Sequence, residues 1–358
     1  MRNSILFLLT LSVLTHNATA QGLTGQVSGM VVDPSGKRVS EARISLANAL
    51  TEQTRQTLTN EDGAFLFTEV LPGRYSLSIV KTGFRELRRE GVMLSAAERL
   101  AIPPLALEVG AVNETVLVTG SAQALQTESS ERSGLVDSQQ LRELSLKGRD
   151  FMGTLQLLPG TLDTANTTRE APGSSSLQGL YFNGNRQGSL GFTIDGIFAM
   201  DTGGGTGPFL EPSIDAIAEV KVLLTNYQAE YGRTAGGTIN AVVKSGSREF
   251  HGGAYYFFRN EDLNANEFFN NRQNLPRPLY RYNYPGYFLG GPVLFPRTAF
   301  NRGRDKLFFF WSQEFLARVY PTPLTFQTFP TALERQGNFS QSLAQNGQLI
   351  VVKDPLTG

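Results

Sequence analysis

The sequence predicts a mainly β protein in three parts: an N-terminal β-sandwich, a mixed α+β domain, and a C-terminal region of long strands. Glycine accounts for 37 of the 358 residues and aromatic residues for 10%, and both are typical of strands joined by tight turns. In the first hundred or so residues, short apolar runs are separated by turn residues at regular spacing. Near the end of the chain the runs lengthen and alternate in polarity. These observations predict the fold class.

The first 20 residues have the pattern of a signal peptide for export. Arg2 gives the positive start, residues 5–14 are apolar, and the small residues Ala18 and Ala20 mark a cleavage site before Gln21. The apolar stretch is shorter than the roughly 20 residues that a membrane-spanning helix needs. No later segment reads as such a helix, so we expect an exported protein that is periplasmic, secreted or inserted as a β-barrel.

The composition argues against several functions. The chain has 32 basic and 32 acidic residues, whereas a nucleic-acid-binding protein needs a basic surplus or stripe. Cysteine is absent and there are two histidines, His16 and His251, so thiolate zinc sites and a cysteine nucleophile are excluded. We therefore expect no cofactor, no metal site and no enzymatic activity.

The first predicted domain covers residues 22–108. Strand patterns at 27–32, 64–67 and 76–80 are separated by turns, as in a β-sandwich. The order of the pieces resembles the carboxypeptidase regulatory-like domain, a transthyretin-like sandwich. The residues that carry the resemblance are Gly29, Asp33, Gly36, Ala42, Asp62, Gly63, Phe65, Phe67, Pro72, Gly73, Tyr75, Gly83 and Phe84. Most of these residues set turns or fill the core; carbohydrate binding is implied by analogy alone.

The second predicted domain covers residues 113–246. Asp137 is an N-cap candidate for a short helix, and a second short helix ends at Pro159-Gly160. Residues 225–246 combine a Tyr-Gly pair, a Gly-Gly pair and an apolar strand that closes on a Lys-Ser-Gly turn. The glycine-rich residues 203–207 are not followed by the Lys-Ser/Thr of a phosphate-binding loop. We interpret them as a loop.

The last region, residues 247–358, contains strand patterns at 253–259, 282–293 and 306–315. Their length suits a tilted strand of a transmembrane β-barrel. In the third strand, Leu307, Phe309, Trp311 and Phe315 fall on one face, and Phe308, Phe310, Ser312 and Glu314 on the other. A soluble β protein with an aromatic core remains the alternative for this segment.

The ordered set of motifs resembles the N-terminal part of a TonB-dependent outer-membrane receptor of the Oar-like type. The resemblance implies that residues 113–246 form the plug and that residues 247–358 begin the outer-membrane β-barrel. It also implies a TonB-type energy-coupling protein, outer-membrane lipid and an unknown small or oligomeric ligand as partners. Only 112 residues follow Gly246, fewer than a barrel of about 22 strands requires, so we expect an incomplete, truncated barrel.

Two groups of candidate site residues follow from the resemblance. The candidate TonB box, which would pair with the coupling protein as an added β-strand, consists of Glu114, Thr115, Val116, Leu117 and Val118. Its alternative, left open, is that 115–119 is the first strand of the plug. The residues expected to pack the plug against the barrel are Glu219, Glu230, Tyr231 and Arg233. We expect Arg233 to be buried, with Glu219 or Glu230 as its counter-charge, because an unpaired buried charge is costly.

The predicted function is uptake of a substrate, such as a carbohydrate or a peptide, across the bacterial outer membrane. Substrate would bind from outside, and the coupling protein would displace the plug from the periplasm. The alternative is a secreted or periplasmic carbohydrate-binding or adhesion protein built on the β-sandwich. That protein would need neither a TonB box nor aromatic residues that face outward from its strands.

Overall fold

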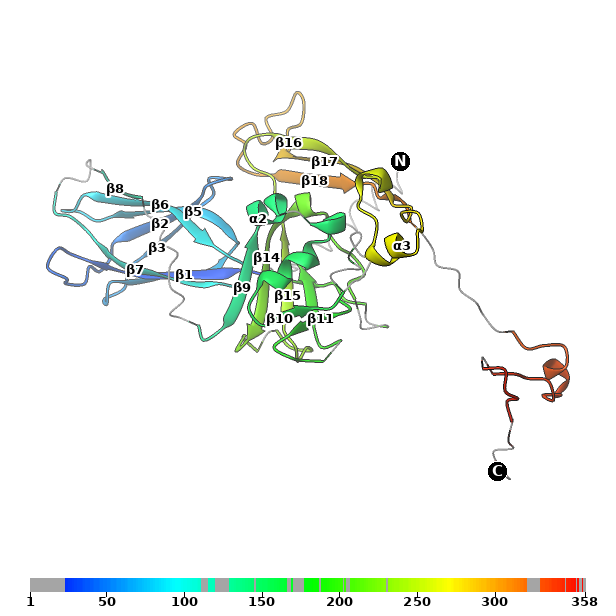
Figure 1. Cartoon of the computed structure of the whole chain (residues 1–358). Coiled ribbons are helices and arrows are strands. Elements are labelled where there is room, and N and C mark those ends of the chain that lie inside the picture. Colours follow the sequence, from blue (N-terminus) through cyan, green and yellow to red (C-terminus); the bar gives the residue numbers. More distant parts are fainter. Residues whose placement is uncertain are drawn as a thin grey trace, which may run out of the picture. The chain divides into compact units, whose positions relative to one another are not determined.

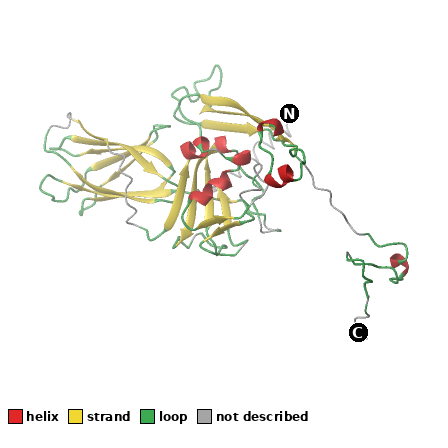
Figure 2. Ribbon diagram, viewed as in Figure 1, coloured by secondary structure: helices red, strands yellow, loops and turns green. Residues whose placement is uncertain are grey.

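The structure, a computed structural model, describes residues 23–110, 115–119, 129–144, 146–165, 169, 177–186, 188–201, 203, 207–229, 231–320, 329–344, 346–351, 353 and 356. The predicted signal peptide at 1–20 lies outside these residues. The described chain is mainly β (Figure 2). It divides into one compact unit of residues 1–256 and 285–315, and a second of residues 257–284 and 316–358. No helix in the described ranges is long and apolar enough to cross a membrane.

The N-terminal domain consists of two sheets, as predicted for a β-sandwich (Figure 1). The smaller sheet has the order β4-β1-β7 and contains β1 (Gly25–Val32), β4 (Ala64–Val70) and β7 (Arg99–Ala106). The larger sheet has the order β3-β2-β5-β6-β8. Its strands are β2 (Arg43–Asn48), β3 (Thr54–Leu58), β5 (Gly73–Val80), β6 (Glu86–Leu94) and β8 (Thr115–Thr119).

One apolar core lies between the two sheets because alternate side chains of each strand face inward. Ile44, Leu77 and Ile79 from the larger sheet are fully buried. Phe65 and Phe67 from the smaller sheet pack edge to face, with ring centroids 6.1 Å apart. Burying large apolar side chains in this way is the main stabilising contribution in a sandwich.

β8 belongs to the sheet of the sandwich and not to the sheet of the following domain. It pairs in parallel with β6 of the sandwich, with Arg88 opposite Leu117. The second domain's own sheet contains no part of β8 and has β9 (Arg132–Asp137) at its edge. The alternative that residues 115–119 form the first strand of the second domain is therefore wrong. β6 would otherwise be an edge strand, and a free edge accepts a further strand.

The central domain contains a five-stranded sheet in the order β13-β12-β15-β14-β9, with helical turns packed on one face. Its remaining strands are β12 (Gly191–Ile194), β13 (Ile197–Phe198), β14 (Ile217–Thr225) and β15 (Thr238–Val243). The helical segments are α2 (Ser138–Glu143) and the 3-10 helices η1 (Lys147–Arg149), η2 (Phe151–Leu157) and η4 (Ile214–Ala216). A hairpin of β10 (Thr161–Asp163) and β11 (Leu180–Phe182) completes it.

Local sequence explains two features of this domain. Asp137 caps α2, because its carboxylate accepts from the amides of Gln139 and Gln140 while the Gln140 side chain returns a bond to the Asp137 amide. The Gly236-Gly237 pair allows two chain segments to meet closely. A Cβ on Gly236 would lie 2.3 Å from the Ser189 hydroxyl oxygen, and Gly237 has a φ of +114°. The predicted N-cap is confirmed.

Three long strands follow: β16 (His251–Arg259), β17 (Arg281–Pro292) and β18 (Phe308–Glu314). They form a sheet in the order β16-β17-β18, and β19 (Ala317–Val319) pairs with the start of β17. The register sets Leu289 opposite Trp311, and Phe288 opposite Ser312. Successive side chains therefore face opposite sides, as the alternation in the sequence predicted.

The second compact unit has 3-10 helices η5 (Glu261–Leu263) and η6 (Glu334–Gln336) and the short helix α3 (Phe268–Arg272) among its described residues. The Arg281 guanidinium forms an ion pair with the Glu261 carboxylate. Arg277 donates to the backbone carbonyls of Glu261, Asp262 and Asn264. Two arginines thus organise the loop that joins β16 to β17.

Candidate functional site

The side chain of Arg149 links the central domain to the long strands. It follows Gly148 at the end of η1, and both residues have a positive φ, which turns the chain sharply. The guanidinium Nη2 lies 2.5 Å from Asp215 Oδ2 and 2.9 Å from Glu314 Oε2, and Nε donates to Glu314 at 3.0 Å. Asp215 belongs to η4 of the central domain, whereas Glu314 is the last residue of β18.

This network is largely shielded from solvent. The Arg149 side chain is 13% exposed and the Glu314 side chain 6%. The Tyr255 ring of β16 lies under the guanidinium, 4.9 Å from Cζ to the ring centre, a cation–π contact. Burial alone would lower the pKa of Arg149, but the carboxylates of Glu314 and Asp215 raise it above its ordinary value. The arginine therefore stays charged.

Further contacts join the same two parts of the chain. The hydroxyl oxygens of Ser213, just before η4, and Ser312 of β18 are 3.3 Å apart. The Lys244 ammonium donates to the Asp215 carbonyl at 2.7 Å and lies 5.3 Å from the centre of the Phe288 ring. Burial lowers the pKa of Lys244, with a further contribution from the charge of Arg142. The inner face of the β16–β18 sheet is thus matched to the central domain by polar and charged groups.

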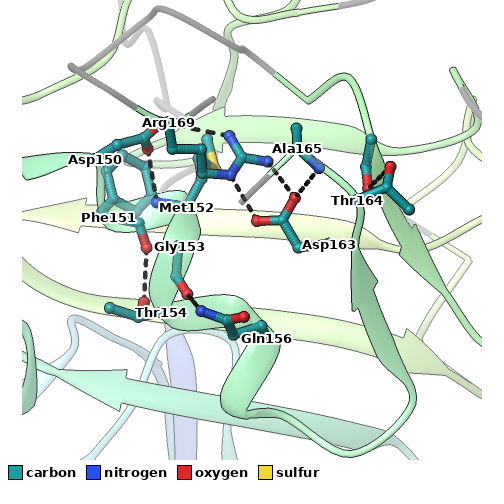
Figure 3. Close-up of polar contacts among 11 residues, drawn as sticks. Asp150, Phe151, Met152, Gly153, Thr154, Gln156, Asp163, Thr164, Ala165 and Arg169 are labelled. Carbon is teal, nitrogen blue, oxygen red and sulfur yellow. Dashed lines mark hydrogen bonds and ion pairs between the residues drawn. The ribbon is translucent and has the colours of Figure 1, made fainter. Parts of the chain in front are cut away.

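Figure 3 shows a second buried cluster, formed by Asp150, Asp163 and Arg169. Arg169 donates through Nε to Asp163 at 2.7 Å and through Nη1 to Asp150 at 3.3 Å. All three side chains are at most 2% exposed. Burial raises the pKa of Asp150, although the charge of Arg169 opposes this shift. Because Asp150 follows Arg149 directly, one turn of chain supplies both clusters.

The outer face of the same strands is apolar and exposed. Tyr256, Tyr287, Leu289 and Trp311 are each between 43% and 59% exposed. Their neighbours along the strands, such as Tyr255, Phe288 and Ser312, make the contacts of the inner face described above. A sheet that is polar toward its own domain and apolar toward the outside has the polarity of a lipid-facing barrel strand.

Three of the predicted packing residues make contacts with other parts of the chain. The Glu219 carboxylate accepts from the Ala96 amide of the sandwich at 2.6 Å. Tyr231 packs against a small apolar cluster of Leu23, Ala96 and Ala97. Arg233 is exposed. Glu230 lies outside the described residues.

The expected burial of Arg233 is therefore wrong, and so is its pairing with Glu219. The Arg233 guanidinium lies over the Phe198 ring at 4.8 Å, where water still solvates the charge and no carboxylate is needed. Glu219 and Tyr231 are at the junction with the sandwich because the outer face of β14 and β15 packs there. Burial raises the pKa of Glu219.

Of the candidate TonB box, Glu114 lies outside the described residues, and Thr115, Val116, Leu117 and Val118 fall in β8. Leu117 is 55% exposed. The sequence had no signal for the pairing of this segment with β6.

Sequence reasoning missed Arg149, Tyr255 and Glu314 as site residues. Glu314 was placed on the polar face of its strand, which was the available signal. Nothing local joins these residues, since they come from different parts of the chain. Among the described residues, no group of three or more His, Cys, Asp or Glu side chains is arranged to hold a metal ion.

Comparison with known families identifies two modules. Residues 26–107 match the carboxypeptidase regulatory-like domain, and residues 242–358 match the outer membrane beta barrel domain. The TonB-dependent transporter Oar of Myxococcus xanthus is 24% identical over 311 residues, which are 83% of this chain and 27% of Oar. The chain is similar to the N-terminal part of an Oar-like TonB-dependent receptor. These matches place the protein in the outer membrane, and its curated relative is a transporter rather than an enzyme.

The similarity to solved structures is weaker. The siderophore receptor PirA of Acinetobacter baumannii is 18% identical, with a TM-score of 0.33, and the match covers 45% of this chain and 22% of PirA. A cohesin–X-dockerin complex from Acetivibrio cellulolyticus is 15% identical, with a TM-score of 0.21, over 24% of this chain and 58% of that chain. Both scores are too low to support an argument. The chain also spans only about a quarter of the length of Oar.

Proposed function

We propose that this chain is the N-terminal part of a TonB-dependent receptor that takes up a substrate across the outer membrane. In this proposal residues 22–108 are a periplasmic sandwich, residues 113–246 the plug, and residues 247–358 the beginning of the barrel. The observation that carries it is the two-faced sheet β16-β17-β18. Its inner face binds the central domain through Glu314 and Arg149, and its outer face exposes Leu289 and Trp311.

The Arg149 network is the proposed plug–barrel contact. Charged groups suit this task because a contact must hold the plug in place and still be separable. An arginine between two carboxylates is stable while shielded. Once water enters between the two surfaces, each group is solvated again and the attraction falls sharply. Plug movement therefore breaks the contact while each charged group regains water as a partner.

The proposed cycle uses the chain's own order. Ligand binds on the outer side, the coupling protein pairs with the segment 114–118, and a pull from the periplasm separates Arg149 from Glu314. We propose a carbohydrate or a peptide as the ligand class because the sandwich family sometimes binds carbohydrate, an argument by analogy. No contact of the described residues favours the alternative of a secreted adhesion protein.

The orientation of the strands in lipid is tested with two nitroxide labels, attached to cysteines introduced into a chain of 358 residues that has none of its own. Leu289→Cys carries the label on the outer face, and Phe310→Cys carries it on the inner face of the neighbouring strand. In the full-length protein in bilayers, the label at 289 should collide with oxygen and be shielded from a water-soluble nickel chelate. The label at 310 should be shielded from both. Equal access of the nickel chelate to the two labels would contradict the barrel assignment.

Transport is tested separately, in cells that produce the full-length protein. Mixed libraries of fluorescent oligosaccharides and peptides are offered, and accumulation in the periplasm is measured with and without a protonophore. We expect one library to accumulate, and accumulation to require the energised membrane. Accumulation that persists after the protonophore would indicate a passive pore and would contradict coupling.

A further inference from the structure

The sandwich contacts both the start of the long strands and the central domain. At the turn between β2 and β3, the Leu50 carbonyl accepts from the amide of Arg248, just before β16, at 3.1 Å, and Glu52 forms an ion pair with the Arg248 side chain. At the loop between β6 and β7, the Ala96 amide donates to the Glu219 carboxylate of β14 at 2.6 Å. One domain therefore touches two parts of the chain that the transport proposal separates.

The first contact, formed by Leu50, Glu52 and Arg248, continues to the turn between β17 and β18. The Arg248 guanidinium donates to the Gly303 carbonyl at 3.3 Å, and the Arg304 guanidinium donates to the Arg248 carbonyl at 3.4 Å. Arg248 thus bonds to the sandwich and also to the turn that joins two of the long strands. The sandwich is fastened to the β16–β18 sheet as well as to the chain that leads into it.

The second contact, formed by Ala96 and Glu219, lies on a polar face of the central sheet. Lys221 is two residues along β14, on the same face, and forms a buried ion pair with Glu131 at 2.8 Å. Asn240 lies opposite Lys221 and is fully buried, and its Nδ2 has no hydrogen-bond partner among the described residues. Interfaces that open in use are more polar than permanent ones. This face therefore suits a contact that opens.

A domain that is fastened to the strands and bound to the central sheet holds these two parts together. We infer that the sandwich is a latch, which keeps the central domain against β16–β18 through the contact at Glu219 and frees it when that contact breaks. The inference rests on the proposed transport function, in which the plug separates from the barrel. It adds that this separation requires the Ala96–Glu219 contact to break as well as the contact between Arg149 and Glu314.

The rate of cysteine labelling tests the inference, because it measures how often the central domain leaves the strands. Ser312→Cys places a thiol on the inner face of β18, where the native hydroxyl oxygen lies 3.3 Å from that of Ser213. A maleimide is added to outer-membrane fractions that contain the full-length protein, and labelling of the protein without this cysteine is subtracted. Glu52→Arg sets a positive charge against Arg248. It should speed labelling about two- to fivefold, as expected for the loss of an exposed ion pair.

The matched control is Glu41→Arg. Like Glu52, Glu41 has a positive φ and an exposed side chain, but its ion pair is with Lys81 of the sandwich itself. This reversal should leave labelling unchanged. At the central sheet, Glu219→Ala removes the acceptor of the Ala96 amide and should also speed labelling, whereas Glu219→Gln retains an oxygen acceptor and should not.

The variant at Glu52 decides the matter, because this residue belongs to the sandwich and its ion pair is with Arg248. Unchanged labelling in Glu52→Arg would overturn the inference, whatever the result for Glu219→Ala. An equal increase in Glu41→Arg would also overturn it, since the effect would then follow from any change of charge in the sandwich. In either case the protonophore-sensitive uptake of the wild-type protein still decides the transport function independently.

Discussion

Arg149 and Glu314 are 165 positions apart in the sequence, yet the guanidinium of one and the carboxylate of the other are in direct contact. The contact joins a 3-10 turn of the central domain to the end of β18. Around it, Asp215 and Tyr255 complete a shielded charge network. This contact connects the central domain to β18. The proposed transport cycle requires these two parts of the chain to separate.

Removing the arginine should strongly destabilise the fold. Arg149→Ala leaves Asp215 and Glu314 largely buried without their counter-charge, and breaking such a pair costs about 3–5 kcal/mol. The free energy of unfolding in urea measures the loss. Arg38→Ala is the control, because its ion pair with Asp62 is more than half exposed and is worth about 0–1 kcal/mol. Similar losses for the two variants would argue against a shielded network.

Stability should respond to pH through Glu219. Its folded-state pKa is raised by burial, while the Ala96 amide and the charge of Lys221 oppose the shift and Glu98 adds to it. The protonated form therefore favours folding, and this contribution is present below the ordinary glutamate pKa and lost as the pH rises through the folded-state pKa.

Glu219→Gln keeps an oxygen acceptor for the Ala96 amide without a charge. Its unfolding free energy should exceed that of the wild type at pH 7, and the difference should vanish at pH values below the ordinary glutamate range. Denaturant titrations across this pH series measure both. Glu61→Gln, at an exposed turn of the sandwich, controls for the general effect of losing one negative charge. A variant less stable than the wild type at pH 7 would refute the prediction.

The cap of α2 offers a local prediction. Asp137→Ala removes the acceptor of two helix amides, which should lower the unfolding free energy by about 1 kcal/mol. Asp137→Asn retains an oxygen acceptor and should lose much less. An equal loss for alanine and asparagine would show that the carboxylate acts by its charge and not as a cap.

Gly237 should tolerate no side chain. A Cβ there would lie 2.6 Å from the Leu223 carbonyl oxygen, in a backbone that is already unfavourable for other residues. Gly237→Ala should cost about 1–3 kcal/mol from overpacking, in addition to the backbone strain. Gly36→Ala has a positive φ but open space around the Cβ, so thermal unfolding of the two variants separates the steric effect from the strain.

Local patterns in the sequence predicted much of this fold. Turn residues such as Asp62-Gly63 and Pro72-Gly73 located the sandwich strands, because their backbone preferences act over a few residues. Asp137 located the start of α2 for the same reason. The alternation in residues 308–314 predicted which side chains share a face, since the period of a strand is two.

Long-range contacts could not be predicted in this way. Nothing near Arg149 in the sequence indicates Glu314, and the position of β8 depends on β6 having a free edge, which is a property of the folded sheet. Glu219 and Tyr231 were expected at the barrel but lie at the junction with the sandwich. Glu219 lies in β14, and nothing near it in the sequence indicates what packs on the outer face of that strand.

The central claim is that the central domain packs against the long strands β16, β17 and β18. Ser213→Cys with Ser312→Cys tests it most directly, because the two native hydroxyl oxygens are 3.3 Å apart and a disulfide requires such proximity. In outer-membrane fractions from cells that produce the full-length protein, mild oxidation should yield an intrachain disulfide in most molecules, and neither single variant should yield one. Recovery of the double variant in the outer membrane without this disulfide would contradict the account.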